Sequence, residues 1–327
     1  MARVSTATGT WTSLLGLAPE TYVPHALHAP GRTYVETNCY TDIIIELLHA
    51  RGDEPRAALG GCVRTDFEGD QWTFFKPPPE DLEQLFGVDI HEMQPYRPLP
   101  EQIEDLIGQG RTLIVELDAW YLPDTASTSY RSDHVKTSVV AEGIDRAGER
   151  LRYFHNTGLH ELGGEDYRGA FRIDLDLPGD VLPPYTEIVR LDAGPRLAGD
   201  ELVAVARERL GHHLARRPRE NPFARFGARL EEDLPDLLAG DARRYHDYAF
   251  ATVRMVGAAF ELLASHSEWL LGPTAGGAGD AMARIVDGSK VLSFRLARRR
   301  PFDPGPVMED LAGAWDEAMA ALDAAVA

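Results

Sequence analysis

The chain has 327 residues and a mass of 36.1 kDa, which is more than one hydrophobic core usually supports and therefore predicts two domains. Apolar residues make up 44% and charged residues 26%, as in ordinary globular proteins, so the composition excludes disordered, collagen-like and coiled-coil chains. The formal net charge of −19 argues against non-specific nucleic-acid binding, which needs a basic surface.

Targeting signals and cysteines narrow the class of protein further. No apolar run approaches the roughly 18 residues that cross a bilayer, and the first twenty residues lack the apolar core of a secretory signal, so we expect a cytoplasmic protein with no membrane partner. The two cysteines, Cys39 and Cys62, cannot form a disulfide scaffold, and no CxxC or Cys/His spacing typical of zinc is present. We therefore predict two free thiols and no metal site.

The first predicted element is a helix that begins directly after Asn38. The Asn38 side chain can cap this helix, apolar residues recur as far as Leu48, and Gly52 follows as a stop signal. Residues 60–79 are rich in turns and contain three consecutive prolines, which exclude a regular element at that point. Two short helices are predicted next, at residues 80–87 and 101–110.

A block of strands follows these helices. Residues 135–145 begin as a strand with Val135, Thr137 and Val139 on one face, and a turn at residues 145–150 links this strand to the next in a hairpin. The other expected strands lie at 112–118 and 151–156, with two edge strands at 173–177 and 186–191.

The remainder of the chain is predicted to be helical. From Tyr245, apolar residues recur near the helical period as far as Leu263. His212 and His213 lie on a polar helix without a carboxylate pair at ligand spacing, and we interpret them as exposed surface. Residues 272–280 are rich in glycine and predict a flexible connector. The other expected helices lie at 199–216, 222–239, 278–297 and 306–326.

The chain changes character near residue 195. Most of the negative charge lies before this point, whereas the second part is less acidic and richer in arginine. A short linker at residues 191–200 separates the two parts. We predict an α+β fold with a mixed domain at residues 1–194 and an all-helical domain at residues 195–327.

Cys39 is the first candidate for chemistry. It lies in the first turn of its predicted helix, where unpaired N–H groups and the helix dipole favour the reactive thiolate. The same N–H groups, with Asn38 beside them, can hold the oxyanion that forms when the sulfur attacks a carbonyl. A cysteine at a helix start can equally be a buried, inert residue. Cys62 has no helix to activate it and is interpreted as structural.

A nucleophilic cysteine needs a base and a group that orients the base. His134 begins a predicted strand and Asn156 ends the next one, so the hairpin brings their segments side by side. Cysteine on a helix, histidine on a strand and an amide or carboxylate on the following strand is the order of papain-like enzymes. We therefore expect Cys39 as nucleophile, His134 as base and Asn156 as orienter, with His155 pointing to the opposite face.

Three segments, LIVELDAWYLPDT, DHVKTSVVAEGID and YFHN, resemble the amino-terminal domain of the butirosin biosynthesis protein H family. The resemblance covers about residues 30–195 and implies a papain-like fold with a Cys-His-Asp/Asn arrangement. It also implies transfer of an acyl group from a carrier-protein thioester to an amine. Because that family typically has Asp where this chain has Asn156, Asp145 is a competing orienter.

A second resemblance rests on NCYTD, FEGDQWTFFK, LPDT and YFHN. These motifs look like those of an uncharacterised bacterial family, some of whose members are encoded beside stand-alone amino-acid:carrier-protein ligases.

The segment FEGDQWTFFK is dense in polar and aromatic residues. Gln71 is an oxyanion candidate, because a glutamine has this role in papain-like enzymes, although here it follows the cysteine. Glu68 and Asp70 are candidates to bind a substrate ammonium group. Trp72 is a candidate for substrate contact, and its alternation with polar residues equally fits the buried face of a strand.

Two residues near His134 complete the set of candidates. Asp118 and Tyr121 follow a strand and either line the cleft or form a strand end and turn. Lys136 is favoured as a solvated residue over a phosphate contact. No glycine-rich phosphate loop is present, so use of ATP or NAD is not expected.

Together these residues predict a cysteine-dependent acyltransferase. It would move an acyl or aminoacyl group from the phosphopantetheine thioester of an acyl carrier protein to a small amine acceptor, with no cofactor bound directly. A cysteine amidase or peptidase, and a non-catalytic binding protein on the same fold, are the alternatives. An acidic carrier protein is expected to dock on arginines of the helical part, which equally fit ordinary solvated charge: Arg225, Arg229, Arg243, Arg244, Arg298, Arg299 and Arg300.

Overall fold

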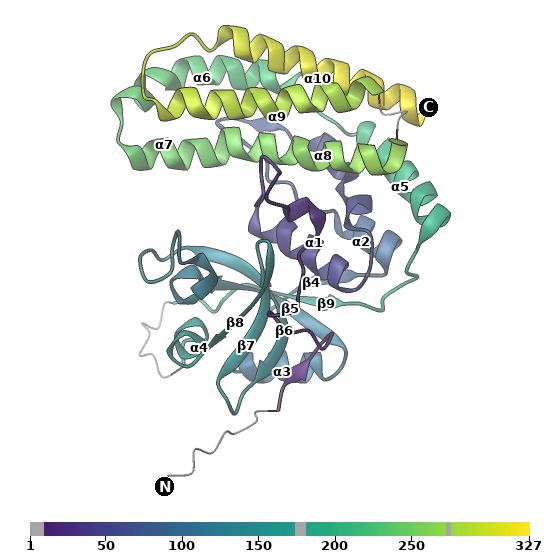
Figure 1. Cartoon of the computed structure of the whole chain (residues 1–327), viewed down its shortest axis with the longest axis vertical. Helices are drawn as coiled ribbons and strands as arrows, with labels where there is room; N and C mark the ends of the chain where they lie inside the picture. Colours follow the sequence, from purple (N-terminus) through teal and green to yellow (C-terminus); the bar gives the residue numbers. More distant parts are fainter. Residues whose placement is uncertain (1–9, 174–180, 273–275) are drawn as a thin grey trace. The chain divides into compact units, whose positions relative to one another are not determined.

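The computed structural model describes residues 10–173, 181–272 and 276–327. This part of the chain divides into two compact units, each described by itself (Figure 1). Unit 1 comprises Met1–His25, Asp42–Asp53 and Phe86–Pro195, and unit 2 comprises Ala26–Thr41, Glu54–Leu85 and Arg196–Ala327. Unit 1 contains an antiparallel sheet and unit 2 is mainly helical, which confirms the predicted α+β class.

Unit 1 is built around one antiparallel sheet. Within the described residues, seven strands form it in the order β4-β9-β5-β6-β7-β8, and β1 pairs with β6. The central strands β5 and β6 are buried at most positions on both faces, as expected of a sheet covered on each side. The strands are β1 (Thr12–Ser13), β4 (Asp89–Met93), β5 (Arg111–Asp118), β6 (Lys136–Asp145), β7 (Arg150–His155), β8 (Gly158–Gly163) and β9 (Thr186–Arg190).

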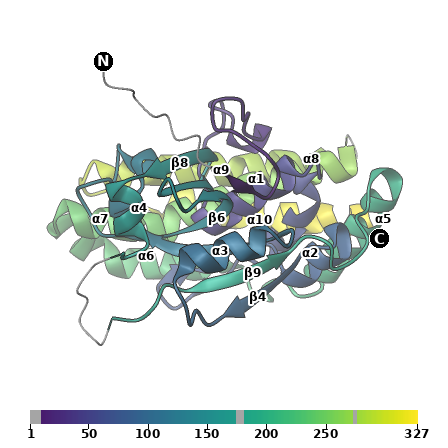
Figure 2. The same ribbon diagram turned by 90° about the horizontal axis from the view of Figure 1, so that it is seen from below.

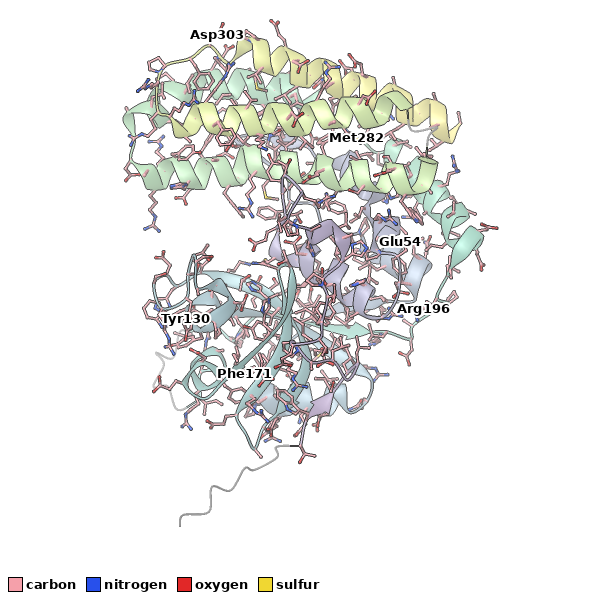
Figure 3. All side chains as sticks on the ribbon, in the orientation of Figure 1. Glu54, Tyr130, Phe171, Arg196, Met282 and Asp303 are labelled. Carbon is pink, nitrogen blue, oxygen red and sulfur yellow. The ribbon has the colours of Figure 1, made fainter. Side chains whose placement is uncertain are left out.

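One face of this sheet carries the main core of unit 1. Leu113, Val115 and Leu117 on β5 pack there with alternate residues of β6 and β7. Helix α3 (Leu99–Ile107) lies along this face (Figure 2) and contributes Ile103 to the core, and the short helix α4 (Glu165–Ala170) adds Tyr167 and Ala170. Phe171, which follows α4, packs at the margin of the same core (Figure 3).

The part of α1 (Cys39–Ala50) that belongs to unit 1 is linked to the opposite face through Tyr22. Phe154 on β7 alternates with the core residue Tyr153 and so points to this face. The ring of Tyr22 contacts Phe154, and its hydroxyl donates to the carboxylate of Glu46 on α1. Glu46 also accepts the backbone N–H of His25 at 3.1 Å, so a buried carboxylate fixes the preceding loop to the helix.

Unit 2 is a helical assembly with a small β-hairpin. The hairpin pairs β2 (Phe67–Glu68) with β3 (Gln71–Trp72), and the 3-10 helix η2 (Pro55–Arg64) packs against α5 and α8. Met282 on α9 is fully buried (Figure 3). The helices are α2 (Pro79–Phe86, of which residues 79–85 belong to this unit), α5 (Gly199–Leu214), α6 (Pro222–Ala239), α7 (Ala242–Ala249), α8 (Met255–Leu271), α9 (Gly276–Ala297) and α10 (Gly305–Val326).

Several sequence-based expectations need correction. The segment at 186–191 forms β9, which lies between β4 and β5 and is therefore not an edge strand. The edge is formed by β4, a strand that was not predicted and that pairs with β9. The helix expected from Tyr245 is three consecutive pieces, since a π-helical segment, Phe250–Arg254, joins α7 to α8. The connector expected at 272–280 is shorter because α9 begins at Gly276. The strand expected at 173–177 falls outside the described residues except for its first position.

The division at residue 195 does not coincide with the compact units. Residues 26–41 and 54–85 precede it in sequence but group with the carboxy-terminal helices. Among the helices that the structure describes, none is long and apolar enough to cross a membrane.

Candidate functional site

Cys39 is the first residue of α1, as the sequence predicts. Asn38 precedes it, and its side-chain oxygen accepts the backbone N–H of Thr41 at 3.0 Å, which is the geometry of a helix N-cap. The Asn38 amide nitrogen donates to the Phe75 carbonyl at 3.0 Å and to the Thr41 hydroxyl at 3.1 Å, and that hydroxyl donates to the same carbonyl at 2.8 Å. The first turn is therefore fixed to the segment that contains Phe75.

The two cysteines differ in access. Cys39 is partly exposed, whereas Cys62 is completely buried in η2. Burial raises the pKa of the Cys62 thiol well above its ordinary value, so this thiol stays protonated and inert. Of the two, Cys39 is the residue that a substrate in solvent can reach.

A carboxylate on α8 fixes the loop that leads into Cys39. Glu261 accepts the backbone N–H groups of Thr33 and Tyr34 at 2.9 and 2.8 Å through its two oxygens. The Tyr34 side chain occupies the space beside Gly257, where a Cβ would lie 2.2 Å from the Tyr34 hydroxyl. Burial raises the pKa of Tyr34, and the charge of Glu261 adds to this effect. Helices of the carboxy-terminal part thus position the approach to Cys39.

His134 belongs to unit 1 and pairs with Asp118. Its Nδ1 donates to Asp118 Oδ2 at 2.6 Å, and its ring stacks on Trp120 with centroids 4.6 Å apart and planes at 10°. The other oxygen of Asp118 accepts the backbone N–H of Trp120 at 3.0 Å, which holds the carboxylate in place. The ring is exposed, and within the described residues no hydrogen bond to its Nε2 is present. This is an oriented imidazole with its reactive nitrogen open to solvent.

The side chain that is hydrogen-bonded to the His134 ring is therefore Asp118 and not the expected Asn156. Asn156 adopts a left-handed conformation with φ of 45° in the two-residue turn between β7 and β8, a position that asparagine tolerates better than most residues. The competing candidate, Asp145, lies at the far end of β6, roughly 30 Å from Lys136 at 3.3 Å per residue. It accepts from Arg150 at 2.9 Å and from the Gly148 N–H.

A cavity of about 290 Å³ lies beside the Asp118–His134 pair. Glu116, Lys136 and Tyr185 line it together with the pair, and Lys136 forms an ion pair with Glu116. Tyr121 does not line this cavity. Its ring packs directly on Gly169 of α4 and on the main core, so it serves the fold.

The remaining candidates lie in unit 2 and have other roles. Both N–H groups of the Asn38 amide are used in the cap, so this side chain is not available as an oxyanion donor. Trp72 is buried among aromatic rings of α6, so it belongs to the buried face of its strand and does not contact a substrate. Asp70 and Gln71 line a separate cavity of about 320 Å³ with residues of α6 and α7, and Glu68 is exposed on the same hairpin.

Sequence reasoning missed a buried polar group that joins two motifs. Asp124, from LPDT, accepts His155 Nδ1 and the Tyr153 hydroxyl at 2.5 Å each, and both partners come from YFHN. His155 Nε2 in turn meets the Thr137 hydroxyl at 2.8 Å. Burial raises the pKa of Asp124, but these hydrogen bonds and the nearby charge of His155 and His160 outweigh it, so the pKa is lowered overall. The sequence signal that could have revealed this group was the presence of both motifs, LPDT with its aspartate and YFHN with its histidine, in both family resemblances.

The interpretation of His213 as exposed surface is wrong. His213 is buried, and its Nε2 donates to Asp81 at 2.7 Å, while Arg209 donates to the other oxygen of Asp81 at 2.6 Å. The partner is 132 residues away in sequence, so the helix pattern alone could not reveal it.

Several of the arginines proposed for docking already have carboxylate partners. Arg225 pairs with Asp66, Arg229 with Asp233 and Arg244 with Asp236. In the described part of the chain, no group of three or more His, Cys, Asp or Glu side chains is arranged to hold a metal ion.

Comparison with known families gives two matches. The DUF1839 N-terminal domain matches residues 23–191, and the DUF1839 C-terminal domain matches residues 199–324. No curated protein matches the chain.

Proposed function

The chain belongs to the DUF1839 family, and we propose that it is a cysteine-dependent acyltransferase with a papain-like catalytic domain. The acyl or aminoacyl group comes from the phosphopantetheine thioester of an acyl carrier protein and passes to a small amine in the cytoplasm. The observation that carries this proposal is the Asp118–His134 pair, because an exposed imidazole with its Nδ1 fixed to a carboxylate is the arrangement of a general base. The resemblance to the butirosin biosynthesis protein H family supplies the substrate class.

The part of α1 that belongs to unit 1 is fixed to the sheet at its carboxyl end. Arg51, just after α1, donates to the carbonyls of Phe86 and Leu191 at 3.3 and 3.2 Å. Leu191 follows Arg190, which pairs with Arg111 at the start of β5, whereas Asp118 ends that strand. The carboxyl end of α1 is thus fixed at the end of the sheet away from His134. That Cys39, at the amino end, acts with His134 is part of the proposal.

The chemistry needs no redox partner. The Cys39 thiolate attacks the thioester carbonyl, the bond from that carbonyl to the phosphopantetheine sulfur breaks, and the arm leaves as a thiol after taking the proton of the His134 imidazolium. The amine then attacks the acyl-enzyme, His134 Nε2 accepts the amine proton, and the amide leaves as the Cys39 thiolate is regenerated. Asp118 stabilises the imidazolium that forms in this step.

Intact-mass analysis with an acyl-loaded carrier protein tests the proposal. Wild type and Cys62→Ala should gain the acyl mass, and Cys39→Ala should not. In His134→Asn the adduct should persist after an amine is added, because aminolysis lacks its base. Hydrolysis of the adduct without transfer to any of a panel of amines would favour the amidase alternative. Absence of any Cys39-dependent adduct, together with alkylation of Cys39 no faster than that of Cys62, would favour a binding protein.

A further inference from the structure

A groove of about 460 Å³ runs beside the first turn of α1 within unit 2. Gly61, Arg64 and Thr65 form one wall, and residues 73–76 and 78–80 form the other. The second wall is the segment to which Asn38 and Thr41 are hydrogen-bonded through the Phe75 carbonyl. The groove and the turn that carries Cys39 are therefore one connected piece of structure.

Two cations line this groove without a carboxylate partner. Within the described residues, neither Arg64 nor Lys76 forms an ion pair, although both are exposed and both face the groove. The Lys76 ammonium group lies 4.0 Å from the centre of the Tyr40 ring, a cation–π contact that holds it next to the residue after Cys39. Glu80 is the carboxylate on the same rim. Among the described residues, most other arginines have acidic partners, whereas these two positive charges remain open to an anionic ligand.

Thr65 supplies a second indication of a ligand. It is 2% exposed, it lines the groove, and its hydroxyl has no hydrogen-bond partner in the described part of the chain. A buried hydroxyl without a partner costs roughly 1–3 kcal/mol, which a ligand amide can recover. Beside it, Phe74 is 52% exposed and Pro78 adds an apolar surface.

We propose that this groove binds the phosphopantetheine arm and leads its thioester to Cys39, an inference that rests on the proposed function. Arg64 and Lys76 take the phosphate, the Thr65 hydroxyl bonds an amide of the arm, and Phe74 with Pro78 contacts its apolar part. The same chemistry occurs in coenzyme A, and the carrier-bound arm is the form that we assign to the groove.

Titration calorimetry tests the groove apart from catalysis. In Cys39→Ala protein, which cannot be acylated, 4′-phosphopantetheine should bind roughly tenfold more tightly than pantetheine, because charge-assisted contacts to the phosphate are lost in the latter. Arg64→Gln with Lys76→Gln should abolish this preference. Thr65→Val should weaken both ligands while the melting temperature stays equal or rises. Lys290→Gln, at an exposed lysine on α9, is the matched control and should change neither value.

The outcomes separate the two proposals. Equal binding of the two ligands, or an unchanged preference in the double variant, overturns the groove even if Cys39 is acylated normally. The predicted binding pattern without any Cys39 adduct sustains the groove and overturns the transferase. Acylation of Cys39 that is faster from acyl-coenzyme A than from the acyl carrier protein, and lost in the double variant, assigns the groove to coenzyme A instead.

Discussion

A buried histidine gives the fold a predictable acid sensitivity. His266 on α8 is completely buried, and its Nδ1 donates to the Arg56 carbonyl at 2.7 Å. Its Nε2 has no partner in the described residues, and Gly60 closes the space beside it, so a proton there would find no acceptor. Burial lowers the pKa of His266 to about 4, with His213 adding to this effect and Asp81 opposing it.

The sign and size of the effect follow from this value. The unfolded chain binds a proton at this ring as pH falls through about 6.5, whereas the folded chain does so only near 4. The unfolded state therefore gains protons first, and stability that is present above pH 6.5 is lost progressively as pH falls to 4. At 1.36 kcal/mol for each unit of pKa difference, the loss is roughly 3 kcal/mol, a large share of a typical free energy of unfolding.

Urea unfolding from pH 7.5 to pH 4, followed by helical circular dichroism, measures this contribution. His266→Asn keeps an N–H near the position of Nδ1 but does not titrate, so the difference in free energy of unfolding between it and wild type should shift by roughly 3 kcal/mol over this range. Carboxylates common to both proteins cancel in the difference. His246→Asn, at an exposed position on α7, is the matched control. A wild-type-minus-His266→Asn difference that is the same at every pH would refute the reasoning.

Three further substitutions test the polar contacts directly. Asp118→Asn should slow amine transfer by roughly 10²- to 10⁴-fold, measured in the acyl-transfer assay, because the imidazolium loses its anionic partner. Glu261→Gln should lower the free energy of unfolding in urea by roughly 1–3 kcal/mol, since one backbone N–H of the loop before Cys39 loses its acceptor. The same substitution should change the alkylation rate of Cys39, and an unchanged rate would show that the loop does not position the thiol. Asp81→Asn should destabilise the chain by roughly 3–5 kcal/mol in the same assay because two buried cationic or hydrogen-bonding partners lose their carboxylate.

The sequence predicted correctly those features that depend on interactions between residues close together in the chain. The Asn38 cap, the Gly52 stop and the hairpin between β6 and β7 were all predicted correctly, because capping and turn preferences act within a few residues. β4 was missed because it mixes acidic and apolar residues and is stabilised by pairing with β9, about a hundred residues later. Such pairing leaves no periodic trace in the sequence.

The candidate site shows the same division between local and distant effects. Placing Cys39 at a helix start needed only local patterns and is confirmed, whereas the strand expected to begin at His134 begins two residues later, at Lys136. Choosing the orienter required knowing which side chain reaches the ring. Asp118 reaches it because β5 and β6 pair Asp118 with Lys136, two residues after His134. Asn156 follows its strand into a tight turn, where its backbone conformation defines its role.

The difference between family domains and compact units bears on what the carboxy-terminal domain is for. The family boundary falls near residue 195, yet η2 lies before it and buries Leu59 and Val63 in a core shared with α5 and α8. The loop before Cys39 is likewise fixed by Glu261, which lies after the boundary. The position of Cys39 at the start of α1 therefore depends on how this preceding loop is held. The carboxy-terminal helices therefore hold the loop before Cys39 and pack against η2, which lines the groove with Arg64. Under the proposed function, this gives them a role in the reaction and not only in docking a partner.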